Sequence, residues 1–162
     1  MRLPSLTILT AFAALVAGGA PLGAQAYSRL TGTWVMDSTN GPDDHGLPKS
    51  ETLTFTPAAH GFDLTATEDD GQGPQTSKFS CVSTPSPSGS AGAESATECR
   101  LQPMRDSVRY MVDVRQNGKV VATERGRLVV SADGKQLRDQ YDATEGTGAA
   151  THHRHIYNKQ RG

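Results

Sequence analysis

The chain has 162 residues, of which 16 are lysine or arginine and 17 are aspartate or glutamate, so its formal net charge at pH 7 is −1. This balance, without a basic cluster, lacks the electrostatic footprint of a nucleic-acid-binding protein or of a protein held to a membrane by basic residues. The length is that of one domain with a single hydrophobic core.

The first 26 residues have the pattern of a secretory signal peptide. A positive charge at Arg2 precedes the apolar stretch LTILTAFAALVAGG, and Ala24 and Ala26 form the A-x-A pattern that signal peptidase recognises. We expect cleavage after Ala26, export to the periplasm or out of the cell, and one mature domain over residues 27–162. The alternative is an uncleaved helix that belongs to the core. No later stretch is long and apolar enough for a transmembrane helix.

Two cysteines, Cys81 and Cys99, lie in the part of the chain that we expect to be exported. Oxidising compartments favour a disulfide between them. The bridge would tie together the ends of a Ser/Pro-rich loop at 83–97, which has little apolar surface to bury. The alternative is two free thiols. A catalytic thiol is not indicated, because neither cysteine has a CxxC partner or a nearby histidine in sequence.

Alternation of apolar and polar residues with period two predicts eight or nine strands. In chain order, the predicted strands cover residues 30–38, 49–57, 60–68, 74–82, 99–103, 107–115, 120–130, 136–144 and 151–159. Asn117-Gly118 and Asp133-Gly134 predict tight hairpin turns, and Gly126 predicts a bulge or sharp bend within its strand.

The connections between these strands decide the fold class. No helical crossovers separate the strands, so the sheet should be antiparallel. Closing such a sheet into an up-and-down barrel removes its exposed edges. We therefore predict an all-β protein with an antiparallel barrel of about eight or nine strands; a two-sheet sandwich is the alternative.

Gly32 and Trp34 form a G-x-W motif at the opening of this expected barrel. With it, the chain resembles small exported bacterial lipocalin-like (calycin-type) proteins. Four further segments carry the resemblance: PKSETLTFTP at 48–57, NGKVV at 117–121, VVSADGKQL at 129–137 and IYNK at 156–159. The resemblance implies a barrel plugged at one end by the tryptophan, with an arginine from a late strand packed across it. It implies no general activity, but it suggests that a small apolar ligand is bound.

The last predicted strand, 151–159, holds three of the five histidines. A turn centred within EGTGAA would place Leu137 opposite Ile156 and Asp139 opposite Arg154, which pairs two apolar residues on a buried face. Arg154 would then point into the barrel. There it would be the arginine that the resemblance places across the tryptophan or, alternatively, part of a polar pocket.

In this register His152 faces the interior, whereas His153 and His155 face solvent. The H-x-H spacing of His153 and His155 makes them weak candidates for a metal site, since a third and a fourth ligand would be needed. The alternative is a solvated pair on the outer face. Trp34 has two readings as well, a ligand-stacking platform or, preferably, a plug in the core.

We expect a small exported binding protein that holds a small hydrophobic molecule in the barrel. The expected ligand-binding residues are Trp34, Met36, Phe55, Leu64, Tyr110, Val112, Tyr141 and Arg154. The alternative is a solid barrel that acts through its loops as a protein-interaction or inhibitor-like envelope-stress module. A barrel-mouth isomerase or cyclase that uses His152, Asp139 and Tyr141 is less favoured, because no catalytic constellation is visible. We expect no cofactor, no nucleic-acid partner, and a monomer or weak dimer.

Overall fold

The structure is a computed structural model of the chain, and it describes residues 22–38, 48–83 and 95–161. One helix, α1 (Leu22–Leu30), precedes the strands. The strands are β1 (Gly32–Met36), β2 (Ser50–Ala58), β3 (Gly61–Asp69), β4 (Gln75–Val82), β5 (Ser95–Pro103), β6 (Val108–Gln116), β7 (Lys119–Val130), β8 (Gln136–Glu145) and β9 (Thr151–Lys159). Within these residues, no helix has the length and apolar character that crossing a membrane requires.

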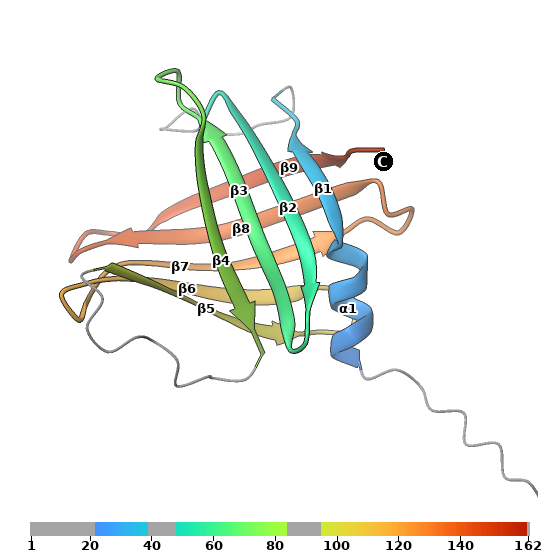
Figure 1. Ribbon diagram of the computed structural model, residues 1–162, viewed down its shortest axis with the longest axis horizontal. Coiled ribbons are helices and arrows are strands. Elements are labelled where there is room, and N and C mark those ends of the chain that lie inside the picture. Colours follow the sequence, from blue (N-terminus) through green and yellow to red (C-terminus); the bar gives the residue numbers. More distant parts are fainter. Residues whose placement is uncertain (1–21, 39–47, 84–94, 162) are drawn as a thin grey trace, which may run out of the picture.

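The strands close into a barrel in sequence order, with β1 paired to both β2 and β9 (Figure 1). The predicted all-β barrel is therefore confirmed. One junction differs from the prediction: β4 and β5 run parallel, while all other neighbours are antiparallel. The reason is geometric, because an odd number of strands cannot alternate in direction around a closed ring. One neighbouring pair must then run in the same direction.

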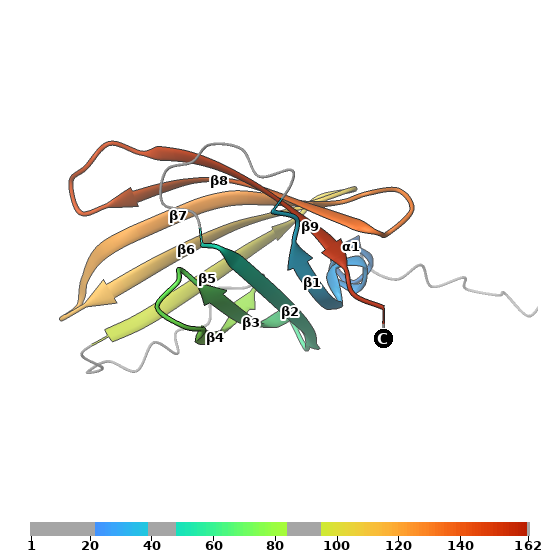
Figure 2. The same cartoon turned by 90° about the horizontal axis from the view of Figure 1, so that it is seen from above.

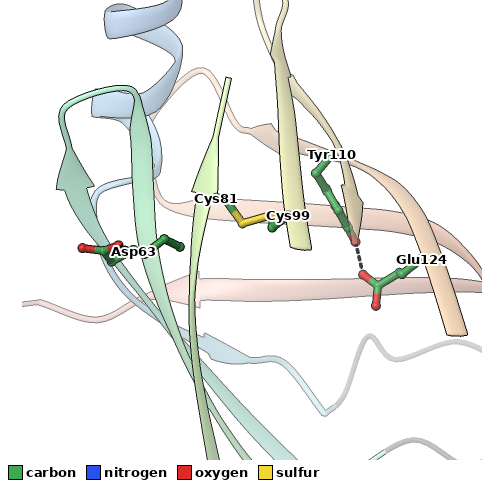
Figure 3. The surroundings of a disulfide bond; sticks show 6 residues. Asp63, Cys81, Cys99, Tyr110 and Glu124 are labelled. Atoms are coloured by element: carbon green, nitrogen blue, oxygen red, sulfur yellow. Dashed lines mark hydrogen bonds between the residues drawn. A yellow bond between two sulfur atoms is a disulfide. The ribbon is translucent and has the colours of Figure 1, made fainter. Parts of the chain in front are cut away.

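The parallel junction is short and is crossed by the predicted disulfide. Only Cys81 with Cys99 and Val82 with Arg100 pair across it. The two cysteines are bonded, with their Cα atoms 4.5 Å apart (Figure 3). A parallel pair requires a connection of roughly a dozen residues to bring the chain back, and the Ser/Pro-rich segment supplies it. The predicted loop at 83–97 ends earlier, because β5 begins at Ser95; residues 84–94 lie outside the described residues.

The helix α1 lies across one end of the barrel, beside the β2–β3 hairpin (Figures 1 and 2). Its residues Ala26 and Leu30 are buried in the core. Tyr27 packs edge-to-face on Phe62, with ring centroids 6.1 Å apart. Trp34 is fully buried beside the helix, and its indole N–H donates a hydrogen bond to the carbonyl of Leu30 at 2.6 Å. Trp34 and α1 together close this end, which we call the floor of the barrel.

The predicted cleavage point after Ala26 lies inside α1. Ala26 and Leu30 are buried against the barrel, and Leu30 belongs to the predicted mature domain. The apolar stretch of the predicted signal peptide falls within residues 1–21, which lie outside the described residues. The signal peptide and the export that it implies stay predictions.

The register of β9 differs from the prediction by one residue. Leu137 pairs with Tyr157, and Asp139 pairs with His155. A shift of one residue exchanges the two faces of a strand, so the predicted orientation of this strand was wrong. Arg154 and His152 are exposed, whereas His155 is buried inside the barrel.

The β8–β9 turn causes this shift. Ala143 pairs with Thr151, so residues 144–150 connect the paired segments. This odd-numbered connection is centred on Thr147, whereas the predicted pairing assumed an even-numbered one. β8 also pairs with β7 as far as Glu145, beyond its last pair with β9, which makes the turn asymmetric. Such asymmetry could not be inferred from apolar alternation.

Lys159 takes the place that the resemblance gave to a late-strand arginine. It pairs with Trp34 between β1 and β9, and its Nζ lies 4.9 Å from the centre of the indole ring. A cation over an indole face is attracted by the ring quadrupole. Arg154 therefore has no part in closing the floor.

The turn prediction at Asn117-Gly118 is confirmed. Asn117 has φ 51° and Gly118 has φ 77°, and the flanking residues Gln116 and Lys119 pair between β6 and β7. Positive φ at both central positions is the reason that this dipeptide forms tight hairpins.

We predict that replacing both cysteines with serine lowers the free energy of unfolding by roughly 3 kcal/mol, the chain-entropy value for a loop of this size. Urea denaturation of the oxidised protein and of the Cys81→Ser/Cys99→Ser variant measures the difference. Reduction of the wild type should produce the same loss. An unchanged unfolding midpoint in both experiments would show that the disulfide does not secure the parallel junction.

Candidate ligand-binding cavity

The interior of the barrel contains a cavity of about 330 Å³. Its inner wall comes from alternate residues of β2 to β9, because successive side chains of a strand point to opposite faces. The apolar lining residues are Leu53, Phe55, Phe62, Leu64, Ala66, Phe79, Val112, Val114, Leu128 and the Cys81–Cys99 disulfide. A cavity of this size does not fit a barrel that is filled by its own side chains.

Polar side chains line the rest of the cavity. They are Glu51, Glu68, Ser77, Thr97, Tyr110, Glu124, Asp139, Tyr141, His155 and Tyr157. We call the end of the cavity away from α1 the mouth. Glu51, Glu68 and Glu124 lie toward it, whereas Tyr110 lies nearer the floor than Val112 and Val114 on the same strand. Among the described residues that line the cavity, none is a lysine or an arginine. The cavity therefore combines an apolar floor with a mouth rich in carboxyl groups.

The expected ligand-binding residues are only partly brought together. Five of them line the cavity: Phe55, Leu64, Tyr110, Val112 and Tyr141. Trp34 lies beneath the cavity as a core plug, and Met36 packs against the core without lining the cavity. Arg154 was placed wrongly, because the register of β9 turns it to the outer surface.

One polar cluster joins three strands through the hydroxyl of Tyr110 on β6. This hydroxyl lies 2.6 Å from Oε1 of Glu124 on β7 (Figure 3), and 3.0 Å from Oδ1 of Asp139 on β8. A phenol has a single hydrogen to donate, so the two carboxyl groups share one donor. The arrangement holds two acids close together in a site with little water access.

Burial raises the pKa of Asp139 well above its usual range, and the nearby charge of Glu124 raises it further. Burial also raises the pKa of Glu124, while the hydrogen bond from Tyr110 opposes that rise. Both effects follow from the cost of placing charge in a poorly solvated interior. Folding therefore shifts both carboxyl groups toward the protonated form relative to the unfolded chain.

A second polar cluster joins β2 and β9. The hydroxyl of Tyr157 donates to Oε2 of Glu51 at 2.6 Å, and Nδ1 of His155 lies 3.0 Å from the same hydroxyl. Both Glu51 and His155 are buried. Nε2 of His155 is also buried, and it has no hydrogen-bond partner among the described residues.

The histidines of β9 do not form the weakly predicted metal site. His153 and His155 share a face as expected, but it is the inward face. His153 stacks on Tyr141, with ring centroids 4.9 Å apart. Within residues 22–38, 48–83 and 95–161, no group of three or more histidine, cysteine or acidic side chains is placed to hold a metal ion.

The suggested enzyme residues are not assembled either. Asp139 and Tyr141 line the cavity. His152 lies on the outer face, where its Nδ1 pairs with Asp142 at 2.8 Å. The three side chains therefore cannot act together on one substrate.

Sequence reasoning missed the acidic character of the mouth. Glu51 has the same parity as Leu53 and Phe55 in β2, and Glu68 has the same parity as Leu64 and Ala66 in β3. The sequence thus already showed, in each of these strands, a glutamate on the same face as the apolar residues that point inward. The missing information was which acids from different strands would meet.

Gly126 makes room for the Tyr110 cluster. It pairs in register with Tyr110 on β6 and Tyr141 on β8, so the expected bulge is not at this position; the irregularity in β6 and β7 lies at Val114/Arg115. A Cβ atom at position 126 would collide with the ring and hydroxyl of Tyr110. A glycine within a strand often marks such a close approach.

Comparison of the chain with protein-family models, with curated proteins and with solved structures finds no match. The closed barrel and its disulfide are features of this structure, whereas membership of the lipocalin-like group stays a prediction.

We predict that Asp139→Asn stabilises the protein above neutral pH. The raised pKa keeps the folded state protonated after the unfolded chain has ionised near pH 4, so the free energy of unfolding falls as the pH rises from that point. The asparagine side chain can still accept a hydrogen bond from the Tyr110 hydroxyl, but it has no carboxyl group to ionise. We expect the variant to be more stable than the wild type by ~1 kcal/mol or more at pH 8.

Urea denaturation at pH 5 and pH 8 measures this effect, with Asp142→Asn as the control at an exposed position on the same strand. If the free energy of unfolding falls between pH 5 and pH 8 by the same amount in the wild type and in Asp139→Asn, the raised pKa does not belong to Asp139.

We also predict that Gly126→Ala costs about 1–3 kcal/mol of stability, because the added methyl group must displace the Tyr110 ring. In a Tyr110→Val background the same change should cost less than ~0.5 kcal/mol, because the ring that the methyl group would displace is no longer there. Chemical denaturation of the wild type, the two single variants and the double variant gives the interaction energy between the two positions. Additive losses would show that the ring is not what position 126 accommodates.

Proposed function

We propose that the protein binds a small molecule inside the barrel, one that is largely apolar and has a single polar end. The observation that carries the proposal is the cavity of about 330 Å³ between an apolar floor and a polar mouth. Small-molecule pockets have volumes of roughly 300–1,000 Å³ and combine apolar walls with a few placed polar groups. A water molecule takes about 30 Å³ of the liquid, so the space suits a ligand of roughly ten non-hydrogen atoms.

Export to an oxidising compartment is part of this proposal. The Cys81–Cys99 disulfide supports it, because such bonds persist outside the reducing cytosol. The signal-like composition of the first 26 residues supports it as well. Mass spectrometry of the secreted or periplasmic protein would locate its N-terminus.

The loop-based alternative rests on the Ser/Pro segment at 83–97, of which residues 84–94 lie outside the described residues. The cavity favours the binding barrel over that alternative, because a protein that acts only through its loops gains nothing from an open interior.

We predict that the protein binds 1-octanol, a neutral molecule of suitable size, and that Val112→Phe weakens this binding at least tenfold. Val112 lines the cavity, so a larger side chain there occupies the space that the ligand needs. Isothermal calorimetry measures the affinity, and native mass spectrometry of the freshly purified full chain detects a retained ligand. Val120→Phe makes the same change at an exposed position and should bind like the wild type. Absence of octanol binding, together with absence of a retained mass, would overturn the proposal.

A further inference from the structure

The outer face of the barrel carries a groove that has no part in the proposed function. It crosses the neighbouring strands β5 to β8 (Figure 1) and has a volume of about 520 Å³. Four arginines line it: Arg100 on β5, Arg109 on β6, and Arg125 and Arg127 on β7. All four are exposed. They are dispersed along the chain, so no basic run in the sequence indicates that they meet.

The pairing of the strands places two of these arginines directly opposite each other. Arg109 pairs with Arg127, and the same row continues to Gln102 on β5 and Gln140 on β8, which also line the groove. Like charges directly opposite each other on one face of a sheet are destabilising. The stability of the barrel therefore does not explain this row, whereas a bound anion would offset the repulsion.

Arg100 and Arg127 are partly neutralised by acids that do not line the groove. Nη2 of Arg100 lies 2.8 Å from Oδ2 of Asp113, and Nη2 of Arg127 lies 3.4 Å from Oδ1 of Asp106. A guanidinium group has five N–H donors. Both arginines therefore keep donors with which a ligand can bond.

The other two arginines have no such partner. The side chains of Arg109 and Arg125 make no hydrogen bond or ion pair with any residue that the structure describes. Asp142 pairs in register with Arg125, but its carboxylate lies 2.8 Å from Nδ1 of His152 instead. Among the described residues that line the groove, none is acidic. The groove thus has an excess of positive charge and of hydrogen-bond donors.

These properties define the class of ligand. The planar guanidinium fork binds phosphate and carboxylate groups through two parallel hydrogen bonds. Residues directly opposite each other on antiparallel strands have Cα atoms about 5 Å apart, so a single molecule with two anionic groups can contact both Arg109 and Arg127. Met104 and Val120, the exposed large apolar residues of the described chain, do not line the groove. A hollow without such apolar anchors suits a soluble molecule better than the surface of a bilayer.

We propose that this groove binds a small soluble polyanion, a molecule with two or more phosphate or carboxylate groups. Arg109 and Arg125 supply the uncompensated charge, and Arg100 and Arg127 add donors on either side. The groove is separate from the interior cavity. The inference therefore goes beyond the proposed function and stands even if no apolar molecule binds inside the barrel.

Isothermal calorimetry of the purified full chain at pH 7 tests the proposal with tripolyphosphate, citrate, orthophosphate and acetate. Sodium chloride at about 0.1 M limits the range of unspecific attraction to about 10 Å. Tripolyphosphate or citrate should bind at least tenfold more tightly than orthophosphate and acetate, and the tighter of the two identifies the anionic group that the groove prefers. If neither binds more tightly than orthophosphate, the proposal is wrong.

A matched pair of double variants tests whether the groove is the site. Arg109→Gln/Arg125→Gln should weaken the binding of the preferred polyanion at least tenfold. Arg138→Gln/Arg154→Gln removes the same charge from two exposed arginines on β8 and β9 that do not line the groove, and its affinity should stay within about twofold of the wild type. Equal losses in the two double variants would show diffuse attraction by the surface charge and would overturn the proposal.

Two further measurements protect this test. Urea denaturation of Arg109→Gln/Arg125→Gln should give an unfolding midpoint no lower than that of the wild type, because neither side chain has a bond to lose and the repulsion at Arg127 is removed. Should that variant fail to fold, the single change Arg125→Gln must still weaken binding severalfold. Sedimentation with phosphatidylglycerol vesicles tests the other source of phosphate. Vesicle binding that depends on Arg109 and Arg125, without binding of either soluble polyanion, would contradict the proposal.

Discussion

Closure of a ring with an odd number of strands is the constraint on which the rest of this structure depends. Eight antiparallel junctions can form from hairpins and from the β1–β9 pairing, but the ninth must be parallel. That junction has only two paired positions and cannot be made by a short turn. The Cys81–Cys99 bond lies at this weakest part of the wall and joins the two strands covalently. The parallel junction thus requires a long connection, which the Ser/Pro segment supplies, and the disulfide lies where this junction has few hydrogen bonds.

The closed wall separates two environments along the barrel axis. Toward α1, Trp34 and its neighbours pack densely, and the buried indole N–H is satisfied by the carbonyl of Leu30. Inward positions that would be apolar in a filled barrel carry Glu51, Glu124 and Asp139 instead. Buried acids cost free energy unless they are protonated or paired. Here the hydroxyls of Tyr157 and Tyr110 are hydrogen-bonded to these acids and reduce that cost.

The two polar clusters share a common design. In each, a tyrosine hydroxyl bridges an acid to a second titratable group: Tyr110 connects Glu124 and Asp139, and Tyr157 connects Glu51 and His155. The phenol supplies a donor without adding charge. The Tyr110 cluster is closely packed, because the Tyr110 ring fills the space that a side chain at position 126 on the neighbouring strand would occupy. Such packing orients the carboxyl groups with little freedom.

Much of the fold could be predicted from the sequence because its signals are local. Period-two alternation, the Asn117-Gly118 turn and the absence of crossover helices predicted a barrel of eight or nine strands, and the barrel has nine. The pairing of Cys81 with Cys99 followed from their being the only cysteines. Five of the eight residues expected to bind a ligand line the cavity for the same reason, since alternation assigns faces within a strand.

The tertiary structure decided what depends on relations between strands. The connection between β8 and β9 has an odd number of residues, and no residue in EGTGAA indicates this. Its length set the register that brought His155 inward and turned Arg154 outward. It likewise placed Lys159 over Trp34. Which acids would meet inside the barrel was fixed by the pairing of strands far apart in the chain. Local patterns determine what each strand is, but a cavity is made by side chains that meet only after the ring has closed, so the chemistry of its mouth appears only in three dimensions.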